Sequence, residues 1–193
     1  MRITRILAIS GSLRKASLNT ALLRAVSKLA PADVRIDLYS GMAQLPLFNP
    51  DIEATDPPAV ADLRNRLLGA DGVFIASPEY AHGVTGVVKN ALDWMVGCEA
   101  FVDKPVALLN TSPRATHAQA ALKETITMMS ARIVDEASIT VPILGSKLDE
   151  PDIVSDPEIS AALYEAILAF RRAIALHRAE GGTDEANLPR PAL

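Results

Sequence analysis

The chain alternates between short apolar runs and longer stretches in which apolar residues recur every three or four positions. A short apolar run between turn residues is typical of a strand buried in a sheet, whereas the longer spacing is typical of an amphipathic helix. We predict strands at residues 6–9, 34–38, 72–76 and 106–109, and a last extended segment at 133–141. We predict helices at residues 18–29, 60–68, 87–95, 118–129 and 158–177.

Strand and helix alternate without an internal repeat, which is typical of a doubly wound α/β fold with helices on both faces of a parallel sheet. Right-handed crossovers leave few arrangements, and five strands favour the order 2-1-3-4-5. We therefore expect a single domain over residues 1–180. Residues 181–193 begin with Gly181 and Gly182 and contain Pro189 and Pro191. We expect this tail to be loose or docked on a partner subunit.

Composition excludes several classes of protein. The 193 residues include 19 Lys and Arg against 23 Asp and Glu, a net charge of −4, without a basic run that would favour nucleic acid. The single cysteine, Cys98, can form neither an internal disulfide nor a zinc site. The first apolar run is broken by Gly11 and Arg14, unlike a signal peptide, and no uncharged stretch is long enough to span a membrane. We expect a soluble, cytoplasmic protein.

A ligand site is expected beyond the carboxyl ends of the strands, where the first and third strands diverge. Three loops meet there, at residues 10–20, 77–86 and 110–117. The first loop holds four hydroxyls, one amide and two cations before a helix begins. Hydroxyl donors, Arg14 and the N–H groups of a helix N-terminus suit a phosphate monoester. Helix capping by Ser17 or Asn19 would explain one of these residues but not the cluster.

Other chemistries have little support in the sequence. The first loop lacks the spacing of a dinucleotide fingerprint and of a P-loop. There is no metal-ligand cluster and no GxSxG motif, so we predict no metal site, no hydrolase and no catalytic side chain. His82 lies in the second loop, where a lone histidine is more often a bystander than a proton donor.

Two motifs coincide with the first and second loops. They are Gly11-Ser12-Leu13-Arg14 with Ser17 and Asn19, and Pro78-Glu79-Tyr80 running into Lys89-Asn90-Ala91-Leu92-Asp93-Trp94. With these motifs the chain resembles the NADPH-dependent FMN reductase family, which has a flavodoxin-like fold and includes quinone, chromate and azo-dye reductases. The resemblance in the order of elements extends to about the end of the last long helix.

The resemblance implies a flavodoxin-like three-layer sandwich with one FMN-binding domain. It also implies a homodimer or homotetramer with the flavin near a subunit interface, and structural or interfacial roles for Lys89, Asn90 and Asp93. The site residues that it implies are Ser10, Ser12, Arg14, Ser17, Asn19 and Thr20 for the FMN phosphate, Pro78, Glu79, Tyr80 and Ala81 beside the isoalloxazine ring, and Ser112 in the loop after the fourth strand.

Three features depart from the family pattern. Ala81 stands where the family usually has Asn, and Thr85 stands where it usually has Pro. The loop that begins Ser112-Pro113-Arg114 replaces a glycine-rich loop that lies against the flavin. Glycines allow close backbone approach, which Pro113 and Arg114 do not. The alternatives are an altered flavin affinity, an altered ring orientation and a loss of flavin binding.

The activity implied by the resemblance is flavin-dependent NAD(P)H oxidoreduction. NADPH or NADH would pass hydride through bound FMN to a quinone, free flavin, metal oxyanion or azo acceptor. The alternatives are a flavodoxin-like electron carrier and a degenerate regulatory member without turnover. Flavodoxins usually shield the ring between aromatic side chains and are strongly acidic. Here only Tyr80 lies in a candidate ring loop and the net charge is −4, which favours the reductase.

Overall fold

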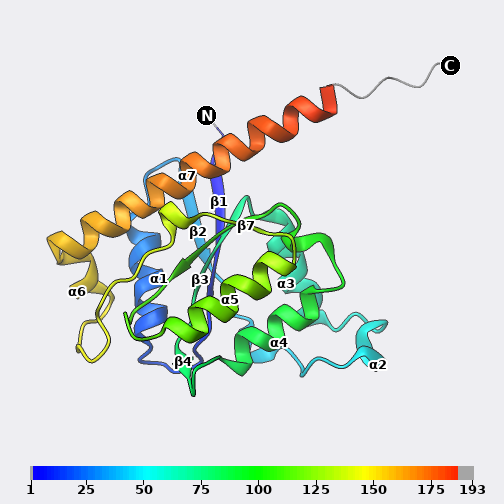
Figure 1. The fold of residues 1–193 in the computed structure, drawn as a ribbon, viewed down its shortest axis with the longest axis horizontal. Helices are drawn as coiled ribbons and strands as arrows, with labels where there is room; N and C mark the ends of the chain where they lie inside the picture. Colours follow the sequence, from blue (N-terminus) through cyan, green and yellow to red (C-terminus); the bar gives the residue numbers. More distant parts are fainter. Residues whose placement is uncertain (1, 187–193) are drawn as a thin grey trace.

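The computed structural model describes residues 2–186, and the side chains of residues 2–180. A five-stranded parallel sheet has the order β2-β1-β3-β6-β7, which confirms the predicted order 2-1-3-4-5 (Figure 1). The strands are β1 (Thr4–Ser10), β2 (Val34–Leu38), β3 (Gly72–Ala76), β6 (Pro105–Leu109) and β7 (Arg132–Ile133).

Helices cover both faces of this sheet, as predicted (Figure 1). One face packs against α1 (Leu18–Leu29), α6 (Glu150–Ser155) and α7 (Pro157–Ala186). The other face packs against α3 (Pro58–Gly69), α4 (Gly86–Met95) and α5 (Thr116–Met128). The chain therefore forms the three layers of a flavodoxin-like fold.

The central strands form because they are apolar on both sides. Along β3, Phe74 faces the α1 and α7 layer, while Val73 and Ile75 face the α3 and α4 layer. All three are at most 1% exposed. Phe74 packs against Phe170 of α7 with ring centroids 4.5 Å apart. Burial on both faces explains the continuous apolar run that predicts this strand.

The fifth strand is much shorter than predicted. Instead of an extended segment over 133–141, β7 is followed by a 3-10 turn, η3 (Asp135–Ala137), and a single bridge between Asn110 and Thr140. The side chain of Ser138 replaces the missing ladder, because its Oγ accepts a hydrogen bond from the N–H of Leu108 at 3.0 Å. The edge of β6 is thus satisfied without a regular strand.

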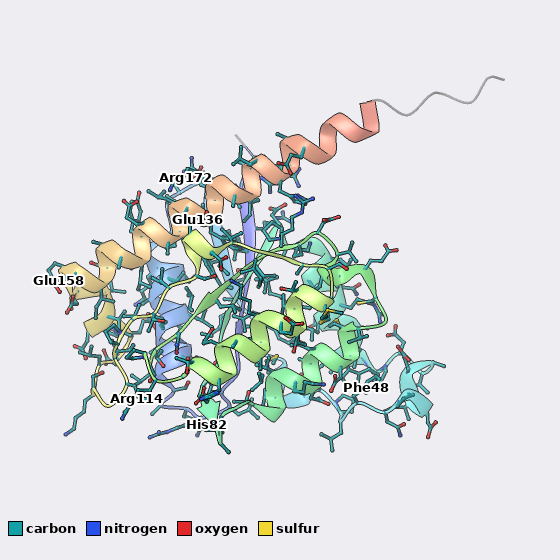
Figure 2. All side chains as sticks on the ribbon, viewed as in Figure 1. Phe48, His82, Arg114, Glu136, Glu158 and Arg172 are labelled. Carbon is teal, nitrogen blue, oxygen red and sulfur yellow. The ribbon has the colours of Figure 1, made fainter. Side chains whose placement is uncertain are left out.

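The segment predicted to be irregular, residues 39–58, contains η1 (Met42–Gln44) and α2 (Pro50–Glu53). It is fastened to α4 by Asn90, whose side chain donates to Pro46 O and accepts from Phe48 N. Phe48 lies between α4 and α2, and its ring packs edge-on against that of Trp94 with 5.1 Å between the ring centroids (Figure 2). This confirms the structural role expected for Asn90.

Helix α7 continues to Ala186, beyond the predicted end at residue 177. Residues 181–186 of the expected tail therefore belong to this helix, and residues 187–193 lie outside the described residues. A 3-10 turn, η2 (Glu99–Phe101), leads from α4 toward β6. Within residues 2–186, no helix combines the length and apolarity needed to cross a membrane.

Candidate functional site

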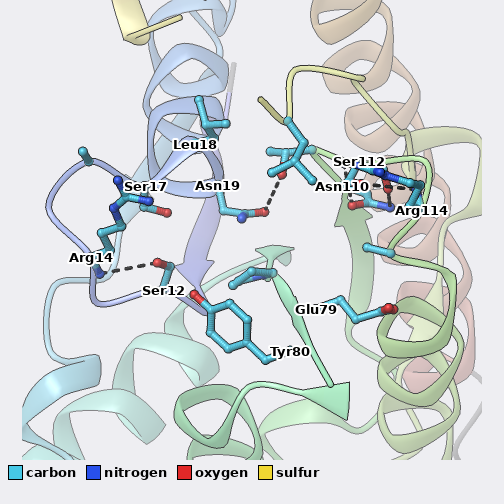
Figure 3. A pocket seen from close by; sticks show the side chains of 15 residues that line it. Ser12, Arg14, Ser17, Leu18, Asn19, Glu79, Tyr80, Asn110, Ser112 and Arg114 are labelled. Carbon is cyan, nitrogen blue, oxygen red and sulfur yellow. Dashed lines mark hydrogen bonds between the residues drawn. The ribbon is translucent and has the colours of Figure 1, made fainter. Parts of the chain in front are cut away.

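A cavity of about 350 Å³ opens at the carboxyl ends of β1, β3 and β6 (Figure 3). Its volume falls within the range of small-molecule sites. The three loops predicted from topology line it, together with Leu144 from the segment before α6. The lining residues are Ser12, Arg14, Ala16, Ser17, Leu18, Asn19, Pro78, Glu79, Tyr80, Asn110, Thr111, Ser112, Arg114, Ala115 and Leu144.

Gly11, in the first loop, holds that loop against the end of β3 and the loop that follows it. The Thr85 hydroxyl donates to Gly11 O at 2.9 Å, and Gly11 N donates to Ala76 O at 2.8 Å. A Cβ on Gly11 would lie 2.3 Å from Ser77 Oγ and 2.7 Å from Val88 Cγ2. Only glycine allows this approach, which sets where the first loop enters the cavity.

The N-terminus of α1 points its backbone donors at the cavity. Ser17 is the N-cap, and its hydroxyl accepts from Thr20 N at 3.3 Å. The N–H groups of Leu18 and Asn19 have no acceptor within the helix, as at any helix start. The first turn contains no acidic residue. With the positive end of the helix dipole, this arrangement favours an anion.

Arg14 and Ser12 lie beside this helix start (Figure 3). Arg14 is exposed and forms no ion pair within the described part of the chain. Its backbone N–H donates to the Ser12 hydroxyl at 3.4 Å. A free guanidinium, hydroxyls and backbone N–H groups together form a donor set for a phosphate.

The loop after β3 forms a hairpin of β4 (Glu79–Tyr80) and β5 (Gly83–Val84), which the sequence did not predict. Its two turn residues, Ala81 and His82, have φ angles of 48° and 60°, the conformation of a type I′ turn. Tyr80 is 63% exposed at the cavity mouth. Glu79 lines the cavity, and its Oε2 accepts from Ala118 N at 2.8 Å. Because the N-cap of α5 provides no side-chain hydrogen bond, Glu79 caps that helix from the hairpin.

The loop after β6 is shaped by Asn110. The Asn110 carboxamide donates to Ser112 O at 2.7 Å and accepts from Ser112 N at 3.0 Å. The next residue, Thr111, donates to Asn19 Oδ1 at 3.5 Å and so reaches the start of α1. No residue from 110 to 115 is among the described residues with positive φ. The loop therefore holds its shape without the glycines of the family pattern, although Arg114 adds a charged side chain to the wall.

Eight of the eleven predicted site residues line the cavity: Ser12, Arg14, Ser17, Asn19, Pro78, Glu79, Tyr80 and Ser112. Three do not. Ser10 and Thr20 are hydrogen-bonded to each other at 2.7 Å, which fastens β1 to α1 behind the cavity. Ala81 lies in the hairpin turn.

Sequence reasoning missed seven lining residues: Ala16, Leu18, Asn110, Thr111, Arg114, Ala115 and Leu144. The topological rule selected the loop at 110–117, and a search of that loop for polar side chains would have found Asn110, Thr111 and Arg114. Leu144 follows the extended segment, and no sequence signal marks it.

His82 stacks on His117, the second residue of α5, with ring centroids 4.2 Å apart and planes 19° from parallel. Neither ring lines the cavity. Within the part of the chain that the structure describes, no group of three or more His, Cys, Asp or Glu could hold a metal ion. The cavity thus offers anion donors and a partly apolar wall.

The chain is similar to several known proteins. Residues 4–143 match the family model of NADPH-dependent FMN reductases. An NAD(P)H-dependent FMN reductase of Pseudomonas aeruginosa is 30% identical over 173 residues, which cover 86% of this chain and 93% of that protein. A quinone reductase of Escherichia coli K12 is 29% identical over 153 residues, covering 75% and 81%.

Among solved structures, the flavoenzyme NAD(P)H:(acceptor) oxidoreductase FerB of Paracoccus denitrificans superposes with a TM-score of 0.81 at 29% identity. The match covers 91% of this chain and 99% of that one. Since the family model spans residues 4–143 of the 193, the chain belongs to the NADPH-dependent FMN reductase family.

Proposed function

We propose that this protein is a cytoplasmic, FMN-dependent NAD(P)H oxidoreductase that transfers hydride from NADPH or NADH to a quinone. Membership of the NADPH-dependent FMN reductase family supports the cofactor and the donor. The names of the relatives, an FMN reductase and a quinone reductase, support the reaction and the acceptor. The observation that carries the proposal is the cavity at the carboxyl end of the sheet, which combines hydrogen-bond donors for a phosphate with a partly apolar wall.

The residues of the cavity fit FMN at both of its ends. Ser12, Arg14 and the start of α1 provide hydroxyl, guanidinium and backbone donors for a phosphate dianion, with no acidic residue in the first turn of the helix. Pro78 and Tyr80 provide apolar and aromatic surface for a planar ring. When bound, FMN supplies the chemistry, taking up a hydride equivalent from reduced nicotinamide and delivering it to the acceptor.

The side chains of the chain bind and orient rather than exchange protons. Arg14 and Ser12 would anchor the phosphate, Glu79 holds the hairpin against α5, and Asn110 fixes the loop after β6. We assign no catalytic acid or base. His82 and His117 stack on each other outside the lining, so neither is placed in the cavity as a proton donor.

A flavodoxin-like electron carrier would need a shielded ring. Tyr80 is the one aromatic residue that lines the cavity among the described residues, and it is 63% exposed. An open mouth of this kind admits a donor and an acceptor in turn, which favours the reductase.

We also propose that the chain assembles as a homodimer or homotetramer. Leu47 is 83% exposed beside Phe48, although Asn90 and Trp94 hold the backbone on either side of it firmly in place. Val96, at the end of α4, is 65% exposed. A second copy of the chain packed here would remove the surface of these apolar side chains from water.

The experiment that tests the proposed activity begins with the absorbance spectrum of the purified protein during FMN titration. NADPH oxidation by the FMN-loaded protein is then followed with and without benzoquinone. We expect saturable FMN binding and NADPH oxidation that depends on the quinone. FMN binding without NADPH oxidation would favour the electron carrier, and a failure to bind FMN would refute the proposal.

A further inference from the structure

Two arginines line the same cavity, and neither has a carboxylate partner within residues 2–180. Arg14 lies in the loop after β1, and Arg114 lies in the loop after β6. Several other surface arginines are paired, for example Arg64 with Asp56 at 2.8 Å and Arg66 with Asp62 at 3.1 Å, whereas Arg172 on α7 is not paired within the described residues. An unpaired guanidinium in a cavity wall is available to an anionic ligand.

The two arginines stand on opposite sides of the cavity. Figure 3 shows Arg14 with Ser12 and Ser17 on one side, and Arg114 with Ser112 and Asn110 on the other. The first side includes the start of α1, where a phosphate monoester is best satisfied. FMN has a single phosphate, so placing it there leaves Arg114 without an anion.

One carboxylate also lines the cavity. Glu79 does not form an ion pair with Arg114, and its Oε2 is engaged by Ala118 N at 2.8 Å. The backbone N–H of Arg114 donates to Ser112 Oγ at 3.2 Å. Because Asn110 fixes Ser112 in turn, the base of the Arg114 side chain is anchored while its guanidinium remains exposed.

We propose that Arg114 binds the phosphate oxygens of the nicotinamide dinucleotide and so favours this donor over one without phosphate. This inference rests on the proposed function. The donor carries a diphosphate, and NADPH carries a further phosphate, whereas a simple quinone carries no charge. A guanidinium presents paired N–H donors that match two phosphate oxygens. Arg114 is thus a binding residue for the donor and plays no part in the hydride transfer itself.

The experiment compares NADPH with dihydronicotinamide riboside, a donor without phosphate. Four FMN-loaded proteins are used: wild type, Arg114→Ala, Arg114→Lys and Arg172→Ala. Arg172 is the matched control, because it is an exposed arginine on α7, also without an ion-pair partner in the described chain, and lies on the side of the molecule away from Arg114 (Figure 2). Each protein is assayed with benzoquinone as a neutral acceptor.

We expect Arg114→Ala to lower kcat/KM for NADPH about tenfold, the size of one charged hydrogen bond. The value for dihydronicotinamide riboside should change by less than about twofold, since that donor offers no anion to lose. Arg114→Lys should recover part of the loss, because it keeps the charge without the planar fork. Arg172→Ala should match wild type with both donors.

Binding measurements test the assignment apart from turnover. The dissociation constant of NADP⁺ from the FMN-loaded protein should rise about tenfold in Arg114→Ala. Added NaCl should weaken the binding of NADP⁺ less in this variant than in wild type, because the screened charge is missing. The ratio of FMN affinity to riboflavin affinity should stay at the wild-type value.

Three results would overturn the inference. A fall in the FMN-to-riboflavin ratio would place Arg114 on the FMN phosphate. In a second assay with a sulfonated quinone in place of benzoquinone, an effect confined to the sulfonated quinone would place Arg114 on an anionic acceptor. Equal losses with both donors would make its role structural. If wild type itself binds no FMN, the proposed function fails before any Arg114 variant is compared.

Discussion

The carboxylate of Glu79 accepts a hydrogen bond from the backbone N–H of Ala118, with 2.8 Å between Oε2 and the nitrogen. The hairpin at the cavity mouth is thereby tied to the first turn of α5, a helix without a side-chain cap of its own. One side chain thus stabilises a helix and positions two of the three loops that form the cavity.

Removal of this cap is expected to destabilise the protein. Glu79→Ala should lower the free energy of unfolding by about 1 kcal/mol, because the N–H of Ala118 loses its acceptor. Glu79→Gln should lose less, since its amide oxygen can still accept. Urea unfolding without ligand measures both values. Glu165→Ala, on the exposed face of α7, is the control, and an equal loss in that variant would show that the cap is not the cause.

Much of the fold could be predicted because burial dominates the pattern of its central strands. The run Val73-Phe74-Ile75 reads as a strand since both of its faces pack against helices. The fifth strand could not be predicted in this way. Its ladder is completed by the side chain of Ser138, which accepts from Leu108 N, and apolar periodicity does not register such a bond.

The lining of the candidate cavity was predicted best where adjacent residues determine it. Ser17 as a helix cap and Arg14 beside a helix start follow from adjacent residues and the strand before them. Asn110 and Leu144 were missed because their places depend on contacts made in three dimensions. The Asn110 carboxamide binds the backbone of Ser112, and an isolated asparagine carries no signal of that role.

Close packing at Gly11 leads to a second prediction. A Cβ there would lie within 2.3–2.7 Å of the Ser77 and Val88 side chains. Gly11→Ala should therefore lower the free energy of unfolding by about 1–3 kcal/mol and weaken FMN binding, because the first loop must move. Gly69→Ala is the matched control, since a Cβ at this position, at the end of α3, would meet nothing within 4 Å. It should be neutral or stabilise by up to about 1 kcal/mol.

Thermal or urea unfolding gives the stability of both glycine variants, and flavin fluorescence gives their affinity for FMN. A destabilised Gly69→Ala with an unchanged Gly11→Ala would contradict the close approach.

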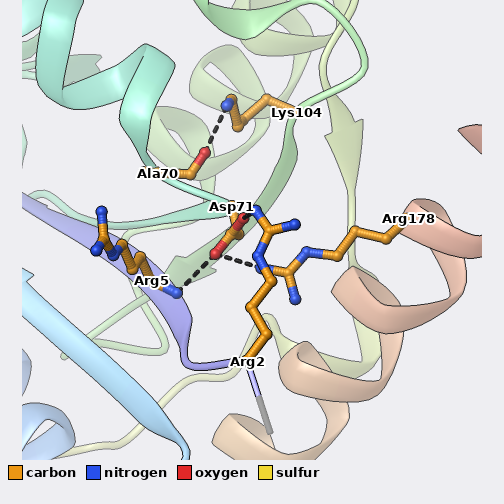
Figure 4. A network of polar contacts seen from close by, with 6 residues as sticks. All are labelled: Arg2, Arg5, Ala70, Asp71, Lys104 and Arg178. Atoms are coloured by element: carbon orange, nitrogen blue, oxygen red, sulfur yellow. Dashed lines mark hydrogen bonds and ion pairs between the residues drawn. The ribbon is translucent and has the colours of Figure 1, made fainter. Parts of the chain in front are cut away.

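Asp71 directly precedes the central strand β3, at the end of the sheet opposite the cavity, and its contacts predict that stability depends on pH (Figure 4). Burial raises the pKa of its carboxyl, but contacts from Arg178, Arg5 N and Arg2 outweigh burial, and the net pKa lies below its usual 3.8. Since the folded pKa is the lower one, this contribution to stability is complete above the unfolded pKa and is lost as pH falls from about 3.8 through the folded pKa.

The test is Asp71→Asn, unfolded in urea at pH 7 and at pH 3. The variant should be less stable than wild type at pH 7, and the difference should shrink at pH 3, where protonation of Asp71 in the unfolded state is favoured. A difference of the same size at both pH values would show that the charge of Asp71 is not what stabilises the fold.

The exposed Leu47 predicts where subunits meet. Leu47→Arg should shift the protein toward the mass of one chain in light scattering, because a charge replaces an apolar side chain that is 83% exposed. Leu176→Arg is the control, since Leu176 is 66% exposed on α7, across the sheet from Leu47. If only Leu176→Arg dissociates the protein, the interface lies on α7 instead. A wild-type protein that is already monomeric would refute the proposed assembly.

The last prediction concerns Arg14 and the FMN phosphate. Its guanidinium has no ion-pair partner in the described chain and lies beside the capped start of α1. A charged hydrogen bond contributes about 1.5–3 kcal/mol, so Arg14→Ala should lower the affinity for FMN about ten- to a hundredfold. Riboflavin, which lacks the phosphate, should bind nearly as it does to wild type. Stability without ligand should change little, because an exposed cation contributes little to folding. Titration of both flavins into both proteins measures these values, and equal FMN affinity would remove Arg14 from the site.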